Sequence, residues 1–267
     1  YEVFEHSQAT WVLASALRSR VSSMLACSED EAASSLAQAI VDGALIEVDG
    51  GYQIPGAYYA ERFIEDWVSK NLSSTEVTEE WLSQFTSGLS DEQCSAVLNA
   101  VRSQISVFHG AAGTGKTHAI RAICRACVAL GERPILLALS ARAARRLEVA
   151  AGFPAMTLAM ALLRLRPSDL AKSIVIVDEF SMVDMIDFRR LIRKLPGDAR
   201  LVLCGDVAQL PSIGPGRLLH SFVHHGSAPV QHLRRVFRQE SPCIPMALNE
   251  IRQGKLPNFP RFDWAQP

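Results

Sequence analysis

The segment Gly110-Ala-Ala-Gly-Thr-Gly-Lys-Thr117 constrains the fold of this chain most, because it matches the spacing G-x-x-x-x-G-K-[ST] in full. It stands between a short apolar run, residues 105–109, and a helical pattern over residues 118–130. Glycines carry no Cβ, so such a loop can curl consecutive backbone N–H groups around phosphate oxygens. The segment therefore predicts a strand–loop–helix unit that binds the phosphates of a nucleotide.

Within this loop, each side chain has a predicted role that follows from its type. Lys116 is expected to reach the outer phosphates, and the Thr117 hydroxyl is expected to ligate Mg²⁺. The N-terminus of the following helix adds partial positive charge. The predicted nucleotide-binding residues of the loop are Gly110, Ala112, Gly113, Thr114, Gly115, Lys116 and Thr117.

A pair of carboxylates follows a second apolar run, residues 174–177. In α/β folds, ligands bind at the carboxyl ends of parallel strands, which is where Asp178 and Glu179 stand. Asp178 is predicted to hold Mg²⁺, and Glu179 is predicted to polarise the attacking water. Together with the glycine loop, the pair indicates a magnesium-dependent nucleoside triphosphatase.

Beyond residue 88 the chain alternates strand and helix patterns. Strands are predicted at residues 105–109, 134–139, 174–177 and 201–204, each short, apolar and flanked by a helix or loop. This is typical of an α/β fold, in which a parallel sheet is covered by helices on both faces.

The first 72 residues predict a smaller α+β unit. Helices are expected over residues 11–26 and, after a Ser28–Glu31 capping box, over the following stretch. Two strands, residues 44–48 and 52–54, flank Asp49-Gly50-Gly51, and Pro55 is expected to end the second. Helix, helix, hairpin is the order of a winged-helix unit. Its second helix carries acidic residues and no Lys or Arg, which favours docking to protein over docking to DNA.

The charges divide in the same way. Residues 1–88 carry a net charge of −10 and residues 89–267 a net charge of +9, so the basic part is the candidate for a polyanionic partner. The predicted divisions are a winged-helix-like unit at 1–72, a connecting helix or linker at 73–88, a P-loop ATPase domain at 89–257, and the start of a following domain at 258–267.

Composition excludes two classes of protein. No apolar run reaches the length of a membrane span, and residues 1–5 lack the basic and apolar regions of a signal peptide. The six cysteines are scattered as small hydrophobic residues would be, which indicates a reducing compartment. We therefore expect a cytoplasmic protein with no membrane partner.

Several motifs give the chain a family resemblance. They are GAAGTGKT at the loop, VDEFSM at 177–182, GDVAQLPSIGPG at 205–216 and FRQ at 237–239. With these motifs the chain resembles superfamily 1 helicases of the RecD/Dda branch, which move 5′→3′ on single strands. The resemblance implies a RecA-like motor domain that uses ATP and Mg²⁺.

The resemblance also implies roles for individual residues. Gln93 stands where the family recognises adenine, Gln209 is suited to sense the γ-phosphate, and Arg238 is suited to stabilise the charge of the transition state. DNA contacts are implied for Ser140, Arg142 and Thr157. At Leu139, Ala141 and Ala159 the chain departs from the family pattern, and Ala159 replaces a DNA-contacting histidine.

Two readings of function remain open at this point. The first is the ATP-hydrolysing half of a single-stranded-DNA translocase or helicase, unable to unwind alone because a second RecA-like domain is missing. The second is a nucleotide-dependent switch or scaffold, such as a motor-like subunit of a DNA repair, recombination or conjugation complex.

Overall fold

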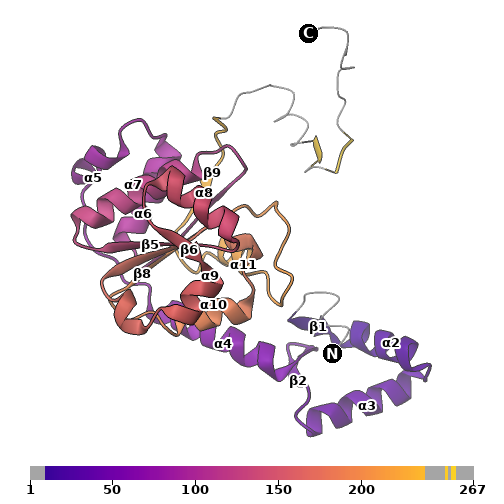
Figure 1. Cartoon of the computed structure of the whole chain (residues 1–267). Helices are drawn as coiled ribbons and strands as arrows, with labels where there is room; N and C mark the ends of the chain where they lie inside the picture. The colour runs from indigo at the N-terminus through magenta and orange to yellow at the C-terminus, as the bar shows by residue number, and fades with distance from the viewer. Residues whose placement is uncertain (1–9, 238–249, 252–253, 257–267) are drawn as a thin grey trace.

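A six-stranded sheet organises most of the chain in the computed structural model, which describes residues 10–237, 250–251 and 254–256 (Figure 1). The strand order is β6-β5-β7-β8-β4-β9, and every adjacent pair is parallel. The strands are β4 (Ile105–Gly110), β5 (Arg133–Ala138), β6 (Ala155–Thr157), β7 (Ser173–Val177), β8 (Arg200–Gly205) and β9 (Val230–Leu233). This confirms the predicted α/β class.

Helices cover both faces of the sheet, because its strands are apolar on both sides. On β7, Val175 and Val177 join one core cluster, while Ile174 and Ile176 join the other, as the alternation of strand side chains requires. The first cluster is completed by α4 (Pro55–Lys70), α9 (Leu158–Arg164), α10 (Met185–Ile192) and α11 (Leu218–His225). The second is completed by α5 (Glu79–Thr86), α6 (Asp91–Arg102), α7 (Lys116–Ala129) and α8 (Ala141–Ala151).

A smaller unit precedes the large sheet. Its elements are β1 (Trp11–Leu13), α2 (Ala14–Leu25), α3 (Glu29–Val41), β2 (Ile46–Val48) and β3 (Gly51–Gln53). The three strands pair antiparallel in the order β1-β3-β2. Asp49 and Gly50 both have positive φ, as a two-residue hairpin turn demands, and the capping box of Ser28 and Glu31 opens α3 as predicted.

One boundary predicted for this unit is wrong. Residues 11–13 form strand β1 rather than the first turn of a helix, because Trp11 pairs with Gln53 and its indole Nε1 donates to the Val48 carbonyl at 2.8 Å. Strand β3 ends at Gln53, ahead of Pro55 as predicted, and Pro55 is the first residue of α4, where its missing N–H removes no helical hydrogen bond.

Helix α4 packs with the large sheet rather than with the small unit. Its buried residues Ala57, Ala60, Ile64 and Val68 belong to the same cluster as the sheet and α10. The small unit has a separate core around Leu17 and Leu36. These contacts favour a boundary near residue 54, whereas the sequence predicts one at residue 72, so we propose that the small unit ends before Pro55.

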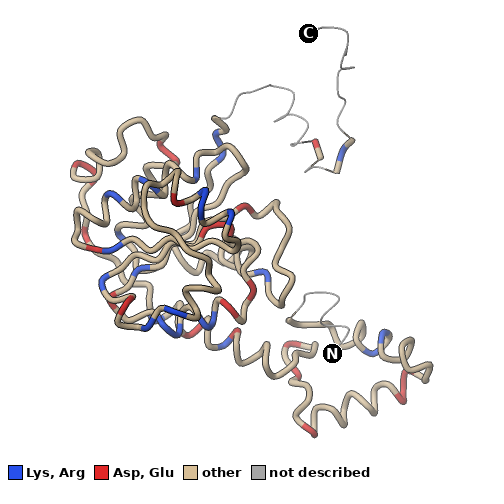
Figure 2. The backbone as a smooth tube through the Cα atoms, in the orientation of Figure 1, with Lys and Arg blue, Asp and Glu red and all other residues tan. Residues whose placement is uncertain are grey.

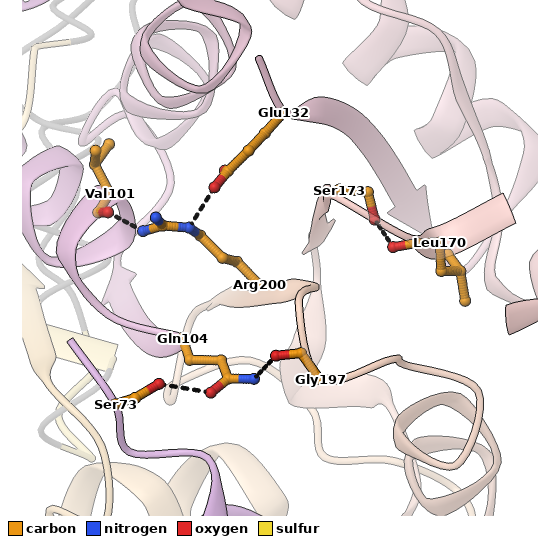
Figure 3. A network of polar contacts seen from close by, with 8 residues as sticks. All are labelled: Ser73, Val101, Gln104, Glu132, Leu170, Ser173, Gly197 and Arg200. Atoms are coloured by element: carbon orange, nitrogen blue, oxygen red, sulfur yellow. Dashed lines mark hydrogen bonds and ion pairs between the residues drawn. The ribbon is translucent and has the colours of Figure 1, made fainter. Parts of the chain in front are cut away.

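A network of polar side chains joins helices, strands and loops at the end of the strands opposite the glycine loop (Figure 3). Arg200, at the start of β8, donates from Nε to Glu132 at 2.7 Å and from its terminal nitrogen to the Val101 carbonyl. Gln104 donates to the Gly197 carbonyl at 2.8 Å and accepts from the Ser73 hydroxyl at 2.7 Å. Both side chains of the Arg200–Glu132 pair are almost buried, so this network fixes α6, β8 and the turn between α7 and β5 against one another.

No helix among the described residues combines the length and the apolar composition that crossing a bilayer requires.

Candidate functional site: the carboxyl edge of the sheet

The glycine loop joins β4 to α7 at the carboxyl edge of the sheet. Gly113 and Gly115 have φ of 86° and 77°, a conformation that side chains with a Cβ rarely adopt. A Cβ at Gly115 would also overlap the Gln93 side chain. The loop can therefore keep its shape only with glycine at these positions.

Lys116 is folded over its own loop. Its ammonium Nζ donates to the carbonyl oxygens of Gly110 at 2.7 Å and Ala111 at 3.1 Å. The Thr114 hydroxyl donates to the Ala111 carbonyl at 2.9 Å and helps to fix the same turn. A phosphate bound in the loop would offer the ammonium a charged acceptor in place of two neutral carbonyls, and charge-assisted hydrogen bonds are the stronger kind.

Gln93 lies directly under the loop and is nearly fully buried. Its amide Nε2 donates to the Thr114 carbonyl at 3.1 Å and the Gly115 carbonyl at 3.3 Å, while Oε1 accepts from the Ser90 N–H at 2.9 Å. In this structure the side chain thus joins the cap of α6 to the loop. Its role in recognising a base stays a prediction.

The carboxylates that follow β7 lie on the same edge. Asp178 Oδ1 accepts the backbone N–H of Glu179 at 2.9 Å, and Glu179 adopts a left-handed backbone with φ of 57°. Strand β8 alone separates β7 from the loop-bearing β4, so both carboxylates stand one strand away from the loop's strand. Burial raises the pKa of the neighbouring Cys204 thiol, and the Asp178 carboxylate raises it further.

The segment after β8 is held in a turn that reaches solvent. Asp206 is buried and accepts the Ala208 N–H at 3.0 Å, and the Gln209 side chain is exposed. The Ser212 hydroxyl lies 2.9 Å from both the Gly214 and the Gly216 carbonyl oxygens and so fixes the loop that follows. Gln209 therefore stands on the edge with Asp178, on a supported turn.

Residues 234–237 run across the glycine loop. Glu92 accepts the N–H groups of Arg234 at 2.7 Å and Arg235 at 3.1 Å, which lowers the pKa of this carboxyl. The Phe237 N–H donates to the Gly113 carbonyl at 2.9 Å. Arg238 lies outside the described residues, but its neighbour Phe237 touches the loop.

The residues predicted to contact DNA stand at helix N-termini on this edge. Ser140 caps α8 by accepting the Ala143 N–H at 3.1 Å, and Thr157 caps α9 by accepting the Met160 N–H at 3.1 Å. Arg142 is exposed in the first turn of α8. The same helix carries further arginines, Arg145 and Arg146, and Figure 2 draws Lys and Arg segments in blue. β5 and β6 are paired, so these two helices begin side by side.

One stacked pair, a buried histidine against an exposed one, was missed by sequence reasoning, because β9 is too short to be predicted and its partner is distant in the chain. His109, at the end of β4, stacks on His232 of β9 with ring centroids 4.3 Å apart. His109 Nδ1 is buried and makes no hydrogen bond within the described part of the chain. Burial first, and then the charge of His232, lower the pKa of His109 to about 4.

This shift predicts a loss of stability in acid. The unfolded chain binds a proton at His109 near its ordinary pKa of 6.5, and the folded chain binds it only near 4. The contribution of this histidine is therefore complete above pH 6.5 and is lost as the pH falls towards 4, by about 3 kcal/mol. Urea unfolding at pH 7.0 and 4.5, compared between the wild type and His109→Gln, measures it; equal losses in both proteins would contradict the assignment.

Comparison with known proteins places the part of the chain that carries this edge in a protein family. The family model described as an AAA domain matches residues 88–265. The ATP-dependent RecD2 DNA helicase of Deinococcus radiodurans is 32% identical over 183 residues, which are 64% of this chain and 25% of that protein. The ATP-dependent DNA helicase dda of Enterobacteria phage T4 is 30% identical over 167 residues, 55% of this chain and 38% of that protein.

The chain thus spans between a quarter and two fifths of the length of these relatives. Among solved structures, the Pif1 helicase from Candida albicans aligns with 64% of this chain and 45% of its own, at 22% identity and a TM-score of 0.45.

Proposed function

The chain belongs to the AAA-domain family, and from this membership we propose that residues 89–257 are the ATP-hydrolysing motor domain of a helicase or translocase that moves on single-stranded DNA. The resemblance to superfamily 1 helicases of the RecD/Dda branch is confirmed by the relatives that match. From the resemblance to this branch we propose that the intact protein moves 5′→3′ along the strand.

One observation carries the proposal: three adjacent strands deliver complementary chemistry to one edge of the sheet. β4 ends in the glycine loop, β7 ends in Asp178 and Glu179, and β8 between them leads to Gln209. A loop of backbone N–H groups, a pair of carboxylates and a neutral amide are what binding and hydrolysing a nucleoside triphosphate require. The separation of these residues in the sequence makes a chance meeting improbable.

Oxygen donors on this edge suit a magnesium ion. Thr117 in the first turn of α7 offers a hydroxyl and Asp178 offers a carboxylate, and Mg²⁺ prefers oxygen ligands of this kind. When bound, Mg²⁺ neutralises charge that develops on the phosphate oxygens.

The remaining residues have separate tasks in the proposed reaction. Lys116 leaves its loop carbonyls to bind the outer phosphates, and Glu179 accepts a proton from the attacking water. Gln209 contacts the γ-phosphate, and Arg238 stabilises the negative charge of the transition state.

Single-stranded DNA is proposed to pass the N-termini of α8 and α9. Helix N-termini favour anions, and both are capped by hydroxyl residues, Ser140 and Thr157, with Arg142 exposed beside them. We propose that these residues bind the phosphates of the strand.

The small unit and the rest of the protein complete the proposal. The unit pairs its strands in the order β1-β3-β2 and has two helices, which supports a winged-helix fold. Its helix α3 is acidic and favours a protein partner over DNA. We propose that this partner belongs to a DNA repair, recombination or conjugation complex in the cytoplasm. Unwinding is proposed to need more chain than these 267 residues, because the chain spans only part of its relatives.

Substituting Glu179 tests this function. Glu179→Gln should keep ATP binding and reduce ATP turnover by about 100-fold or more, because the amide cannot accept the proton of water. Turnover is measured with and without oligodeoxythymidine, and ATP binding by calorimetry. Glu148→Gln, which removes a carboxylate from the neighbouring α8 at a surface ion pair, should leave turnover unchanged. If the wild type binds ATP but Glu179→Gln does not change its turnover, the nucleotide-dependent switch is favoured instead.

A further inference from the structure

An arginine of α8 reaches the predicted catalytic base. The terminal nitrogen NH2 of Arg146 lies 3.6 Å from Oε1 of Glu179. Glu179 is the half-buried member of the pair, with 32% of its side chain exposed, whereas 71% of the Arg146 side chain is exposed. The guanidinium therefore reaches the carboxylate from the solvent side and keeps most of its own surface available to another anion.

The backbone of Glu179 restricts where its carboxylate can go. Its left-handed φ of 57° and the hydrogen bond from its N–H to Asp178 fix the residue at the start of a short helical turn, η2 (Phe180–Met182). Movement of the carboxylate is thus left to its side-chain torsions. A partner that attracts the carboxylate decides the direction in which it points.

Arg146 also belongs to the surface proposed for DNA. It follows Arg142 by four residues, so both side chains lie on the same face of α8, one turn apart. Ser140, one of the residues proposed to bind phosphate, caps the start of this helix. Arg145, the preceding residue, instead pairs with Glu148 of its own helix at 2.8 Å, and within the described part of the chain it forms no ion pair with a residue that follows β7.

We propose that Arg146 is a positioning residue that holds the Glu179 carboxylate until a phosphate of single-stranded DNA takes its guanidinium. The inference rests on the proposed function. A guanidinium that binds a phosphate bidentately turns its donors towards that phosphate, so the Glu179 carboxylate is released to accept a proton from water. Coupling between two ligands of one group is reciprocal, so Glu179 must in turn weaken binding of the strand.

A double-mutant cycle on DNA affinity tests this without any need for turnover. The chain is titrated with fluorescent oligodeoxythymidine at low salt, where phosphate contacts contribute most. Glu179→Gln should tighten binding about two- to fivefold, the range expected for release from an exposed ion pair. The same substitution should change nothing in Arg146→Ala, because there the carboxylate has no guanidinium to withhold.

The cycle separates the proposal from a general charge effect. Removing one negative charge would strengthen DNA binding equally in both backgrounds, so an equal gain in the wild type and in Arg146→Ala overturns the inference, as does failure of the chain to bind the strand. Arg145→Ala is the matched control and should retain the full effect of Glu179→Gln. Arg146→Lys should restore part of the coupling, since it keeps the charge but not the bidentate geometry.

Failure of the proposed function is recognised separately. If Lys116→Ala binds ATP as the wild type does, the nucleotide site itself is wrong, whatever the cycle shows. If ATP binding depends on Lys116 and the cycle shows no coupling, only the role of Arg146 is rejected.

Discussion

Lys116→Ala should weaken ATP binding by about tenfold or more and reduce ATP turnover by at least about 100-fold. The loop would keep its shape, since Gly113, Gly115 and the Thr114 hydroxyl fix it without the lysine. What the variant lacks is the only described side-chain cation that the loop itself supplies, now held by the carbonyls of Gly110 and Ala111. Calorimetry with ATP and a steady-state phosphate-release assay measure the two losses.

Lys194 offers a matched control for this experiment. Its ammonium also donates to two backbone carbonyls, those of Leu162 and Leu165, at 2.6 and 2.7 Å. Lys194 follows α10, however, and these carbonyls belong to the end of α9 rather than to the glycine loop. Lys194→Ala should therefore lower the melting temperature and leave ATP binding intact. Equal loss of ATP binding in both variants would mean that stability, rather than phosphate contact, explains the result.

Arg200→Ala should lower the free energy of unfolding by about 3–5 kcal/mol, the largest stability effect we expect in this chain. The substitution leaves the almost buried Glu132 carboxylate without its ion-pair partner and the Val101 carbonyl without its donor. Urea denaturation followed by circular dichroism measures the loss.

The size of that effect depends on burial. Arg145→Ala breaks an exposed pair with Glu148 and should cost less than about 1 kcal/mol. Replacing both buried partners, as Arg200→Met with Glu132→Leu, should recover much of the loss because no charge then remains buried alone. If Arg200→Ala costs no more than Arg145→Ala, the network of Figure 3 does not stabilise the fold.

The parts of the fold that are encoded locally could be predicted from the sequence. The glycine loop between β4 and α7 and the capping box at Ser28 depend on residues close in the chain. The apolar run before Asp178 likewise marks β7 without knowledge of its neighbours. Such elements are fixed by their own dihedral preferences and hydrogen bonds.

The parts that depend on distant partners could not be predicted. Strand β1 exists because residues 11–13 pair with residues 51–53, and β6 and β9 are edge strands of three and four residues. The pair of Arg146 and Glu179 joins α8 to the end of β7, and no spacing in the sequence relates the two. For the same reason α4 reads as part of the small unit although its apolar face belongs to the large core.

Helix α4 connects the small unit rigidly to the larger domain. α4 has 16 residues, so it is a rod of about 24 Å, and its apolar side is fixed to the core of the larger domain. At its first turns it is joined to β3 without an intervening loop, and Gln53 donates to Glu61 at 2.6 Å across that joint. A force on a partner bound to the small unit would therefore be transmitted through the rigid helix α4 to α10, which a flexible linker would not do.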